Sequence, residues 1–306
     1  MRVALIIILT VISLSSWGQQ LPLYSNYNFN MFGINPAVAG SQSCVDLRIG
    51  HRKQWLGFEG EPTTSFVGAH GAFGKKRYSF HGAGLYLEND VAGPLERNSV
   101  SAAYAYHIKV NRKNMLSMGL SLGLTNIQLD ENQLNVEDFL DPLLAGSQAE
   151  TLFPQIGIGL WYQNQDRFIG LSVKNVNEPG LTEIGDDSAL RRHIFLTAGK
   201  SIAVDKKLFF KPSVNLRSVS GSPIAADVNL LFDYNDLFEF GASFRGGHGI
   251  SGMVKVGLLR YLTLGYAYDM TLNKLRLGAR NTHEVMLGIQ ACPRGSKKGI
   301  PCSAYD

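Results

Sequence analysis

The sequence predicts an all-β protein, a fourteen-stranded antiparallel β-barrel of an outer membrane with short periplasmic turns and longer external loops. Three observations predict it: alternating side chains along many segments, an export signal at the start, and connections that alternate between short and long. The alternation is clearest at residues 115–125, MLSMGLSLGLT, where Leu and Met occupy one side and Ser, Gly and Thr the other. Because the polar side is small and uncharged, one face is expected to meet lipid and the other a lumen.

The composition suits one folded domain in a membrane. Hydrophobic residues make up 45% of the chain and charged residues 18%, below the roughly 25% typical of soluble domains. The 33 glycines concentrate in the strand segments, where glycine lets a wall curve and leaves room in the lumen. A net charge of +4 without a basic patch interleaved with aromatics argues against nucleic-acid binding.

The N-terminal part predicts export. Residues 1–18 combine Arg2, an apolar stretch and small residues at a cleavage position, so we expect a signal peptide cut before Gln19. The apolar stretch is shorter than the ~20 residues of a spanning helix, which disfavours a membrane anchor. Residues 19–43, rich in Asn and aromatics, are expected to form a periplasmic N-terminal segment, and residues 291–306 a periplasmic tail.

The barrel is expected at residues 44–290, and its strands can be assigned in order. Bulky apolar residues repeat on one parity of each segment, and an even number of strands returns both ends of the barrel to the periplasm. Every second connection is short, while those between are mostly longer, which agrees with the strand count. The fourteen segments lie near residues 44–51, 63–73, 79–87, 99–110, 114–129, 154–163, 167–174, 192–203, 207–218, 223–233, 237–245, 249–258, 261–271 and 282–290.

Charge divides between the two ends of the predicted barrel. The external loops are expected to be acidic and to include Glu88, Asp90 and Glu96. The periplasmic turns are basic, and we hypothesise that this rim docks a partner, although solvated charge is the more common explanation. The rim candidates are Lys75, Lys76, Arg77, Arg112 and Lys113.

The lumen of such a barrel is wide enough to need filling or to conduct. Charged residues on the inward parity are expected to pair across the interior. We also expect a plug, formed either by the N-terminal segment or by the long insert at residues 130–153. The inward charges are Asp46, Arg48, Lys211, Arg217, Asp227, Asp233, Glu239, Lys255 and Asp269.

Candidate chemistry is sparse. A disulfide between Cys292 and Cys302 is slightly favoured, and one between Cys44 and Cys292 at the barrel seam stays open. The seven His are scattered, and none stands beside a nucleophile or in a metal-ligand pair. No cofactor, metal or phosphate loop is expected, and an enzyme is disfavoured.

Three motifs resemble the PorP/SprF family of outer-membrane proteins associated with the type IX secretion system of Bacteroidota. The first is RKQWLGFEGEPTT at residues 52–64, and the second is INPAVAG at residues 34–40, with Val38 where the family often has an aromatic. The third comprises GYAYD at residues 265–269 and His283 with Glu284. The resemblance spans the mature chain, although the tail from Ala291 is longer than usual.

The resemblance implies a non-enzymatic barrel of the secretion and gliding machinery. It implies that the barrel helps to export or anchor a large cell-surface protein through that cargo's C-terminal domain. The implied partners are this cargo, type IX secretion components and outer-membrane lipid, without nucleic acid or a small-molecule substrate. A diffusion channel for small solutes is the main alternative, and a barrel enzyme comes third.

The first motif offers candidates for partner binding. We expect Trp55 and Phe58 to leave the first strand into an external loop, with Gly57 and Gly60 permitting tight bends and Pro62 restarting an extended path. Such a loop can present its aromatics to a partner. Packing of the same side chains against the barrel rim is an equally good interpretation.

Overall fold

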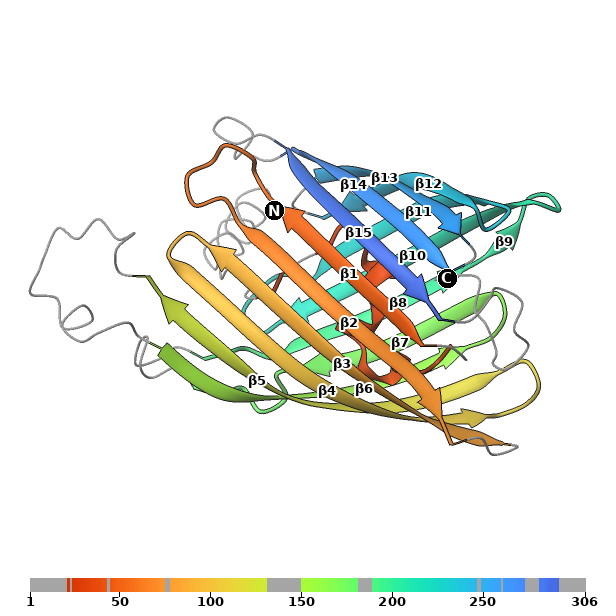
Figure 1. The fold of residues 1–306 in the computed structure, drawn as a ribbon, viewed down its shortest axis with the longest axis horizontal. Coiled ribbons are helices and arrows are strands. Elements are labelled where there is room, and N and C mark those ends of the chain that lie inside the picture. The colour runs from red at the N-terminus through yellow and green to blue at the C-terminus, as the bar shows by residue number, and fades with distance from the viewer. Residues whose placement is uncertain are drawn as a thin grey trace, which may run out of the picture.

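A computed structural model describes residues 21–22, 24–42, 45–74, 78–130, 150–180, 189–246, 249–259, 261–272 and 281–291. They form one antiparallel sheet that closes on itself, as Figure 1 shows. The last strand pairs with the first, from Asp46 opposite Gln290 to Lys53 opposite His283. The strands are β1 (Asp46–Lys53), β2 (Thr63–Phe73), β3 (Ser79–Ala92), β4 (Leu95–Lys109), β5 (Met115–Leu129), β6 (Glu150–Gln163), β7 (Arg167–Lys174), β8 (His193–Lys200), β9 (Ile202–Ala203), β10 (Leu208–Val219), β11 (Ala225–Tyr234), β12 (Phe238–Arg245), β13 (Gly249–Leu259), β14 (Leu262–Thr271) and β15 (Thr282–Gln290).

These fifteen labels correspond to fourteen strands of the barrel wall. The short β9 continues β8 after Ser201, and both pair with the same neighbour, β10. The predicted fold class is therefore confirmed, and most predicted strand bounds lie within two residues of the observed ones. Closure matters because a membrane interior supplies no water to satisfy a free sheet edge.

The alternation predicted for residues 115–125 places bulky side chains on the outside. Leu122 and Leu124 are 56% and 46% exposed on the outer face of β5, whereas Ser117 and Thr125 are fully buried toward the lumen. In a membrane the exposed leucines contact lipid tails. No helix among the described residues is long and apolar enough to cross a membrane.

The connection between β3 and β4 is shorter than the predicted external loop. Glu88, Asp90 and Glu96 were expected in an external loop, but they lie within the two strands, which are joined by Gly93 and Pro94 alone. Charged residues usually indicate a solvated loop, yet here Glu88 faces the lumen and forms an ion pair with Arg97. An inward charge that finds a partner is compatible with a strand of a barrel.

Connection lengths distinguish the two ends of the barrel. The connections that follow β2, β4, β6, β9, β11 and β13 are short and share one end, which we call the periplasmic end. The opposite end, which we call the external end, carries most of the longer connections, among them those that follow β1 and β7. Strand β1 therefore runs from the periplasmic end to the external end.

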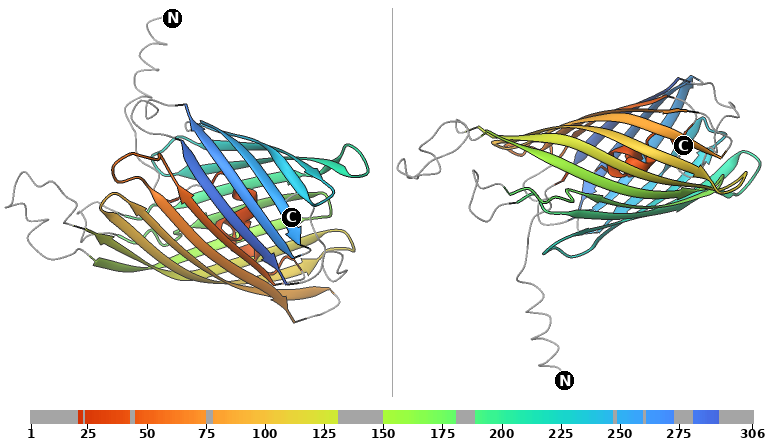
Figure 2. Two further views of the ribbon diagram at one scale, coloured as in Figure 1. Left: turned by 45° about the horizontal axis from the view of Figure 1, so that its top comes forward. Right: turned by 90° about the horizontal axis from the view of Figure 1, so that it is seen from below.

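The N-terminal segment fills the lumen. Residues 21–22 and 24–42, which we call the plug, contain η1 (Tyr27–Asn30), α2 (Met31–Ile34) and η2 (Pro36–Val38), and Figure 2 shows them inside the barrel. The expectation of a periplasmic segment is therefore wrong for these residues. Their aromatic and Asn side chains are buried against the inner wall, where the rings gain packing contacts and the amides exchange water for protein hydrogen-bond partners.

The inner wall has an apolar half and a polar half. Aromatic plug residues pack with the apolar half on β2 to β8, as where the rings of Tyr24 and Phe66 meet edge to face at 4.9 Å. The polar half, on β10 to β15 and β1, carries the predicted inward charges in ion pairs, for example Lys211 with Asp233 at 2.6 Å. The apolar wall residues are Phe66, Tyr86, Ala103, Ala105, Trp161, Phe168 and Phe195.

Candidate functional site

The segment 34–40 of the plug sits directly against glycines of the wall. A Cβ atom on Gly82 would lie 1.8 Å from the Ala39 carbonyl oxygen, and one on Gly119 would lie 2.2 Å from the Ala37 nitrogen. Only glycine lets two backbones approach this closely. The INPAVAG motif and the glycines of β3 and β5 are thus two sides of one contact.

Side chains of the plug and the wall fix the same segment by hydrogen bonds. Asn35 Nδ2 donates to the Leu160 carbonyl at 3.0 Å, and Ser172 Oγ donates to the Ile34 carbonyl at 2.9 Å. His107 Nε2 lies 2.8 Å from the Ala39 carbonyl and, because a carbonyl only accepts, it donates there. Each of these bonds joins the plug to a different strand, so the plug has one defined position.

A buried ionic cluster locks the external end of the plug. Ser25 donates through its backbone N–H to Glu284 at 2.7 Å and through Oγ to Asp269 at 2.6 Å. Arg52 bridges the same two carboxylates at 3.0 and 2.9 Å, and Arg245 reaches Asp269 at 3.2 Å. Arg52, Asp269 and Glu284 belong to the separate sequence motifs described above, and this cluster gives them a shared structural role.

A second cluster surrounds Glu88. Tyr24 Oη donates to Glu88 Oε2 at 2.7 Å, and Arg97 donates to Oε1 at 2.7 Å. Close by, Asn30 Nδ2 donates to Tyr86 Oη at 2.7 Å. The glutamate that the sequence assigned to a loop is therefore a further attachment point for the plug.

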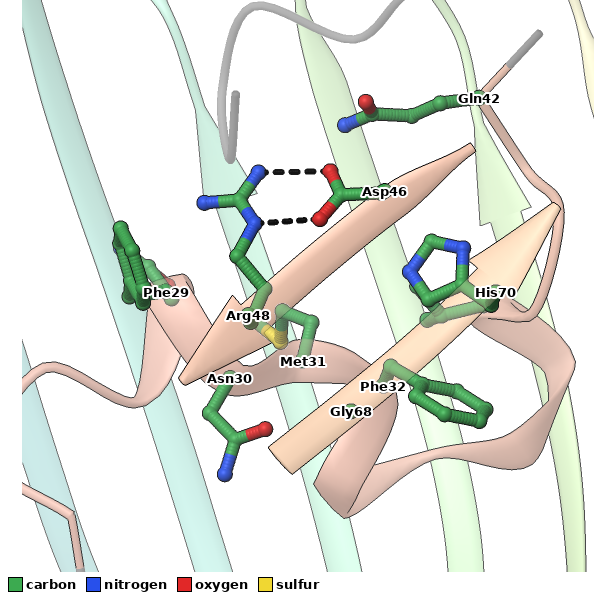
Figure 3. A pocket seen from close by; sticks show the side chains of 11 residues that line it. Phe29, Asn30, Met31, Phe32, Gln42, Asp46, Arg48, Gly68 and His70 are labelled. Carbon is green, nitrogen blue, oxygen red and sulfur yellow. Dashed lines mark hydrogen bonds and ion pairs between the residues drawn. The ribbon is translucent and has the colours of Figure 1, made fainter. Parts of the chain in front are cut away.

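A pocket lies beside the plug toward its periplasmic end (Figure 3). The Arg48 guanidinium makes two bonds to the Asp46 carboxylate, at 2.5 and 2.8 Å, and stacks over Phe29 at 4.5 Å from the ring centre. On the other side of the pocket, Phe32 and His70 meet edge to face at 4.8 Å. The pocket has space for about one water molecule. Its two charged side chains, Asp46 and Arg48, pair with each other.

The first external loop, residues 54–62, is tied down on both sides. The N–H of Trp55 lies 3.3 Å from Thr282 Oγ1 at the start of β15, and the N–H of Gly93 donates to the Gly60 carbonyl at 3.0 Å. Gly57 and Gly60 have φ values of +83° and +71°, the left-handed region that glycine tolerates best. The loop thus spans from the last strand to the β3–β4 turn in one fixed conformation.

Phe58 is the exposed aromatic among the five candidates in this loop. It is 45% exposed, while Trp55 is half-buried. Pro62 closes the base of the loop, where its carbonyl accepts from the Gln54 N–H at 2.8 Å. The loop therefore offers one aromatic side chain to the exterior.

An ion pair between Lys53 and Glu61 stabilises the loop from within. Hydrogen bonds from the Lys53 ammonium and then from the Gly57 N–H hold the pKa of the Glu61 carboxyl below its usual range. The contact is therefore present at neutral pH and is lost only when the pH falls below the usual range of a glutamate.

The other predicted candidates divide into two groups. Arg112 and Lys113 are exposed in the turn at residues 110–114 at the periplasmic end. Lys75, Lys76, Arg77, Cys44, Cys292 and Cys302 lie outside the described residues, as do the expected signal peptide and most of the tail. No group of three His, Cys, Asp or Glu that could hold a metal occurs in the described part of the chain.

Sequence reasoning missed the residues that hold the plug. Ser25 lies 244 and 259 positions from the two carboxylates that it contacts. No local period connects residues so far apart. The available signal was that charged residues of separate motifs, Arg52, Asp269 and Glu284, all fall on inward-facing positions.

Comparison with known proteins gives one family and a fold. The sequence pattern of a family described as type IX secretion system membrane protein PorP/SprF matches residues 16–289. No curated protein sequence matches the chain.

Solved structures share the barrel architecture. The toluene transporter TbuX of Ralstonia pickettii superposes with a TM-score of 0.50 at 12% identity, covering 92% of this chain and 99% of the transporter. The monoaromatic hydrocarbon channel CymD superposes with a TM-score of 0.51 at 11% identity, covering 88% of this chain and 94% of the channel. Identities this low establish the fold alone.

Proposed function

Because the chain belongs to the PorP/SprF family of type IX secretion system membrane proteins, we propose that it anchors a large secreted protein at the cell surface. In this proposal the barrel binds the C-terminal domain of that cargo at its external end. The chain is an outer-membrane β-barrel, and its family and structural neighbours are proteins of secretion and of channels. We assign it no catalytic role.

The filled lumen is the observation that carries the proposal. The plug is bonded to the wall along its length, and the inward charges are paired with one another. A diffusion channel, the alternative function, needs a continuous water-filled lumen. A barrel whose lumen is occupied by its own buried segment is better suited to hold a partner than to pass solutes.

The first external loop supports the same function. Its backbone is fixed by contacts with β15 and with the β3–β4 turn, and it holds Phe58 outward. An interface formed by a rigid loop loses little conformational entropy on binding. Aromatic side chains are also enriched among residues that dominate binding energy. Phe58 is accordingly the first side chain to test.

Retention of the surface protein can be measured in cells that carry Phe58→Ala. We expect the cargo to shift from the cell surface to the medium, because loss of an aromatic anchor weakens binding about tenfold or more. Phe73→Ala is the matched control, since Phe73 is 49% exposed but lies at the periplasmic end of β2. Full retention of the cargo in cells lacking this chain altogether would refute the anchoring role.

We also propose that the basic periplasmic rim contacts an acidic surface of a secretion component. Arg112 and Lys113 are exposed there, and like charges gathered at one rim attract an oppositely charged partner. Replacing Lys75, Lys76, Arg77, Arg112 and Lys113 with Gln should lower export of the cargo severalfold while the barrel still assembles. Arg192→Gln, at the external end and outside the first external loop, is the control. Unchanged export in the variant with all five substitutions would refute the role of the basic rim.

A further inference from the structure

The seam of the barrel is the pairing of its first and last strands, β1 and β15, which Figure 1 shows side by side. The other neighbours in the wall follow one another along the chain, so the connection between them limits how far one strand can slide past the next. Strands β1 and β15 lie at opposite ends of the barrel sequence. The register of the seam must therefore be set by contacts rather than by a turn.

The alternation of side chains does not select this register by itself. On the outer face, Ile49 of β1 lies opposite Leu287 of β15. Because successive side chains of a strand point to opposite faces, a slip by two residues keeps every outward side chain outward. Val285 or Ile289 opposite Ile49 would suit the membrane equally well. The native register needs a further determinant, and the inner face of the seam supplies one.

The plug binds both strands of the seam near the external end. Arg52 and Glu284 are direct partners across the seam, and they form an ion pair at 3.0 Å. The backbone N–H of Ser25 donates to the Glu284 carboxylate at 2.7 Å, and Arg52 donates to Ser25 Oγ at 2.5 Å. One residue of the plug thus contacts both members of a seam pair.

Farther along the plug, Phe29 contacts a second pair of direct partners, Arg48 and Gly288. The Arg48 guanidinium lies over the ring, 4.5 Å from its centre, as Figure 3 shows. A Cβ on Gly288 would lie only 3.1 Å from the same ring. A slip by two residues would bring Met286 or Gln290 to this place, and either side chain would collide with Phe29. The ring therefore accepts β15 only where its glycine falls.

The last described residue of the plug contacts a third pair of direct partners, Asp46 and Gln290, at the periplasmic end. Gln290 Nε2 donates to Gln42 Oε1 at 2.9 Å and to Asp46 Oδ2 at 3.3 Å. The plug therefore meets the seam at three levels, near its two ends and between them. At each level it contacts a pair of residues that lie opposite each other in the native register.

The plug is also connected to one side of the seam, since it ends at Gln42 and β1 begins at Asp46. A binding surface held beside its target by a short connection acts at a high effective concentration. A slip by two residues would move β15 by about 7 Å along β1. Glu284 would then leave Ser25, and Gln290 would leave Gln42. The contacts with the plug favour the native register over its neighbours on both sides.

We propose that the plug is a template for closure of the barrel, against which β15 finds its register with β1. In this role the plug occupies the lumen before the seam forms, and β15 docks on the plug and on β1 together. The role concerns assembly of the barrel. It is independent of the cargo, so the anchoring function stands or falls separately.

The test traps the seam with cysteine pairs on the outer face of the barrel, in a chain whose native Cys44, Cys292 and Cys302 are replaced by Ser. Ile49→Cys with Leu287→Cys reports the native register. Slips by two residues are reported by Ile49→Cys with Val285→Cys and by Ile49→Cys with Ile289→Cys. Outer-membrane fractions are oxidised, and the disulfide yield of each pair is measured on non-reducing gels.

The template variant combines Phe29→Ala with Gln42→Ala. Its matched control, Phe32→Ala with Asn30→Ala, also removes one ring and one amide from the plug, but their partners lie on β2 and β3. The template variant should lose the native disulfide severalfold relative to the control and gain the slipped disulfides. The control should keep the native disulfide as the main product, because its contacts with the seam are intact.

Equal yields of the native disulfide in the two variants would overturn the template role. If the template variant does not reach the outer membrane, milder single variants replace it in the same assay. Phe29→Leu is then compared with Phe32→Leu, and Gln42→Ala with Asn30→Ala. Slipped disulfides confined to Phe29→Leu and Gln42→Ala support the proposal, and equal patterns within each comparison overturn it.

Discussion

Replacing Gly119 with Ala is expected to displace the plug and to turn a silent barrel into one that conducts ions. The added Cβ would lie 2.2 Å from the Ala37 nitrogen. Because this nitrogen belongs to the backbone of the packed plug, it cannot rotate away as a side-chain atom can. Overpacking of this kind costs about 1–3 kcal/mol. Single-channel recording in planar bilayers should therefore show frequent openings of the variant and none of the wild-type chain.

The matched control for that experiment is Gly265→Ala. Gly265 also faces the lumen, but a Cβ there would meet Met286 only at 3.6 Å, an ordinary contact. The control should stay silent and keep the thermal stability of the wild type. If Gly119→Ala is as silent and as stable as Gly265→Ala, the plug does not seal the lumen as described.

Arg52→Leu is expected to produce the largest loss of stability. Arg52 compensates the buried carboxylates of Glu284 and Asp269, and all three side chains are at most 11% exposed. Removing one partner of a buried ion pair costs about 3–5 kcal/mol, because the remaining charge stays desolvated. Unfolding of the detergent-solubilised barrel, followed by the shift in its gel mobility on heating, should occur at a much lower temperature.

Arg192→Leu provides the comparison for Arg52. The ion pair of Arg192 with Glu178 is solvent-exposed, at 48% and 33%, and pairs of this kind contribute about 0–1 kcal/mol. Adding Glu284→Gln and Asp269→Asn to Arg52→Leu should restore part of the lost stability, since the uncompensated charges are then removed. Equal effects of Arg52→Leu and Arg192→Leu would contradict the role given to the buried cluster.

The strands of the barrel could be predicted from the sequence because their period is local. Leu122 and Ser117 fall on opposite faces of β5 simply by parity, and lipid on one side with a lumen on the other imposes that parity along the whole strand. The same argument placed inward charges such as Lys211 and Asp233 in pairs. Closure of the sheet then followed from the even number of strands.

The plug could not be placed with the same certainty, because its contacts are not local. The sequence indicated glycines in strands and an Asn-rich segment, but not that Gly119 and Ala37 meet. Glu88 was assigned to a loop because charged residues usually seek water, whereas in the lumen it pairs with Arg97. Arrangements of this kind depend on tertiary contacts between residues that no short pattern connects.

Partner binding can be tested directly on the chain in its native membrane. The chain, tagged at a tolerated position, can be purified from its native outer membrane in mild detergent, and the proteins that remain bound can be identified by mass spectrometry. We predict recovery of a large surface protein attached through its C-terminal domain, in reduced amount with Phe58→Ala. Recovery of a lone barrel that conducts ions would contradict the account and favour the diffusion channel.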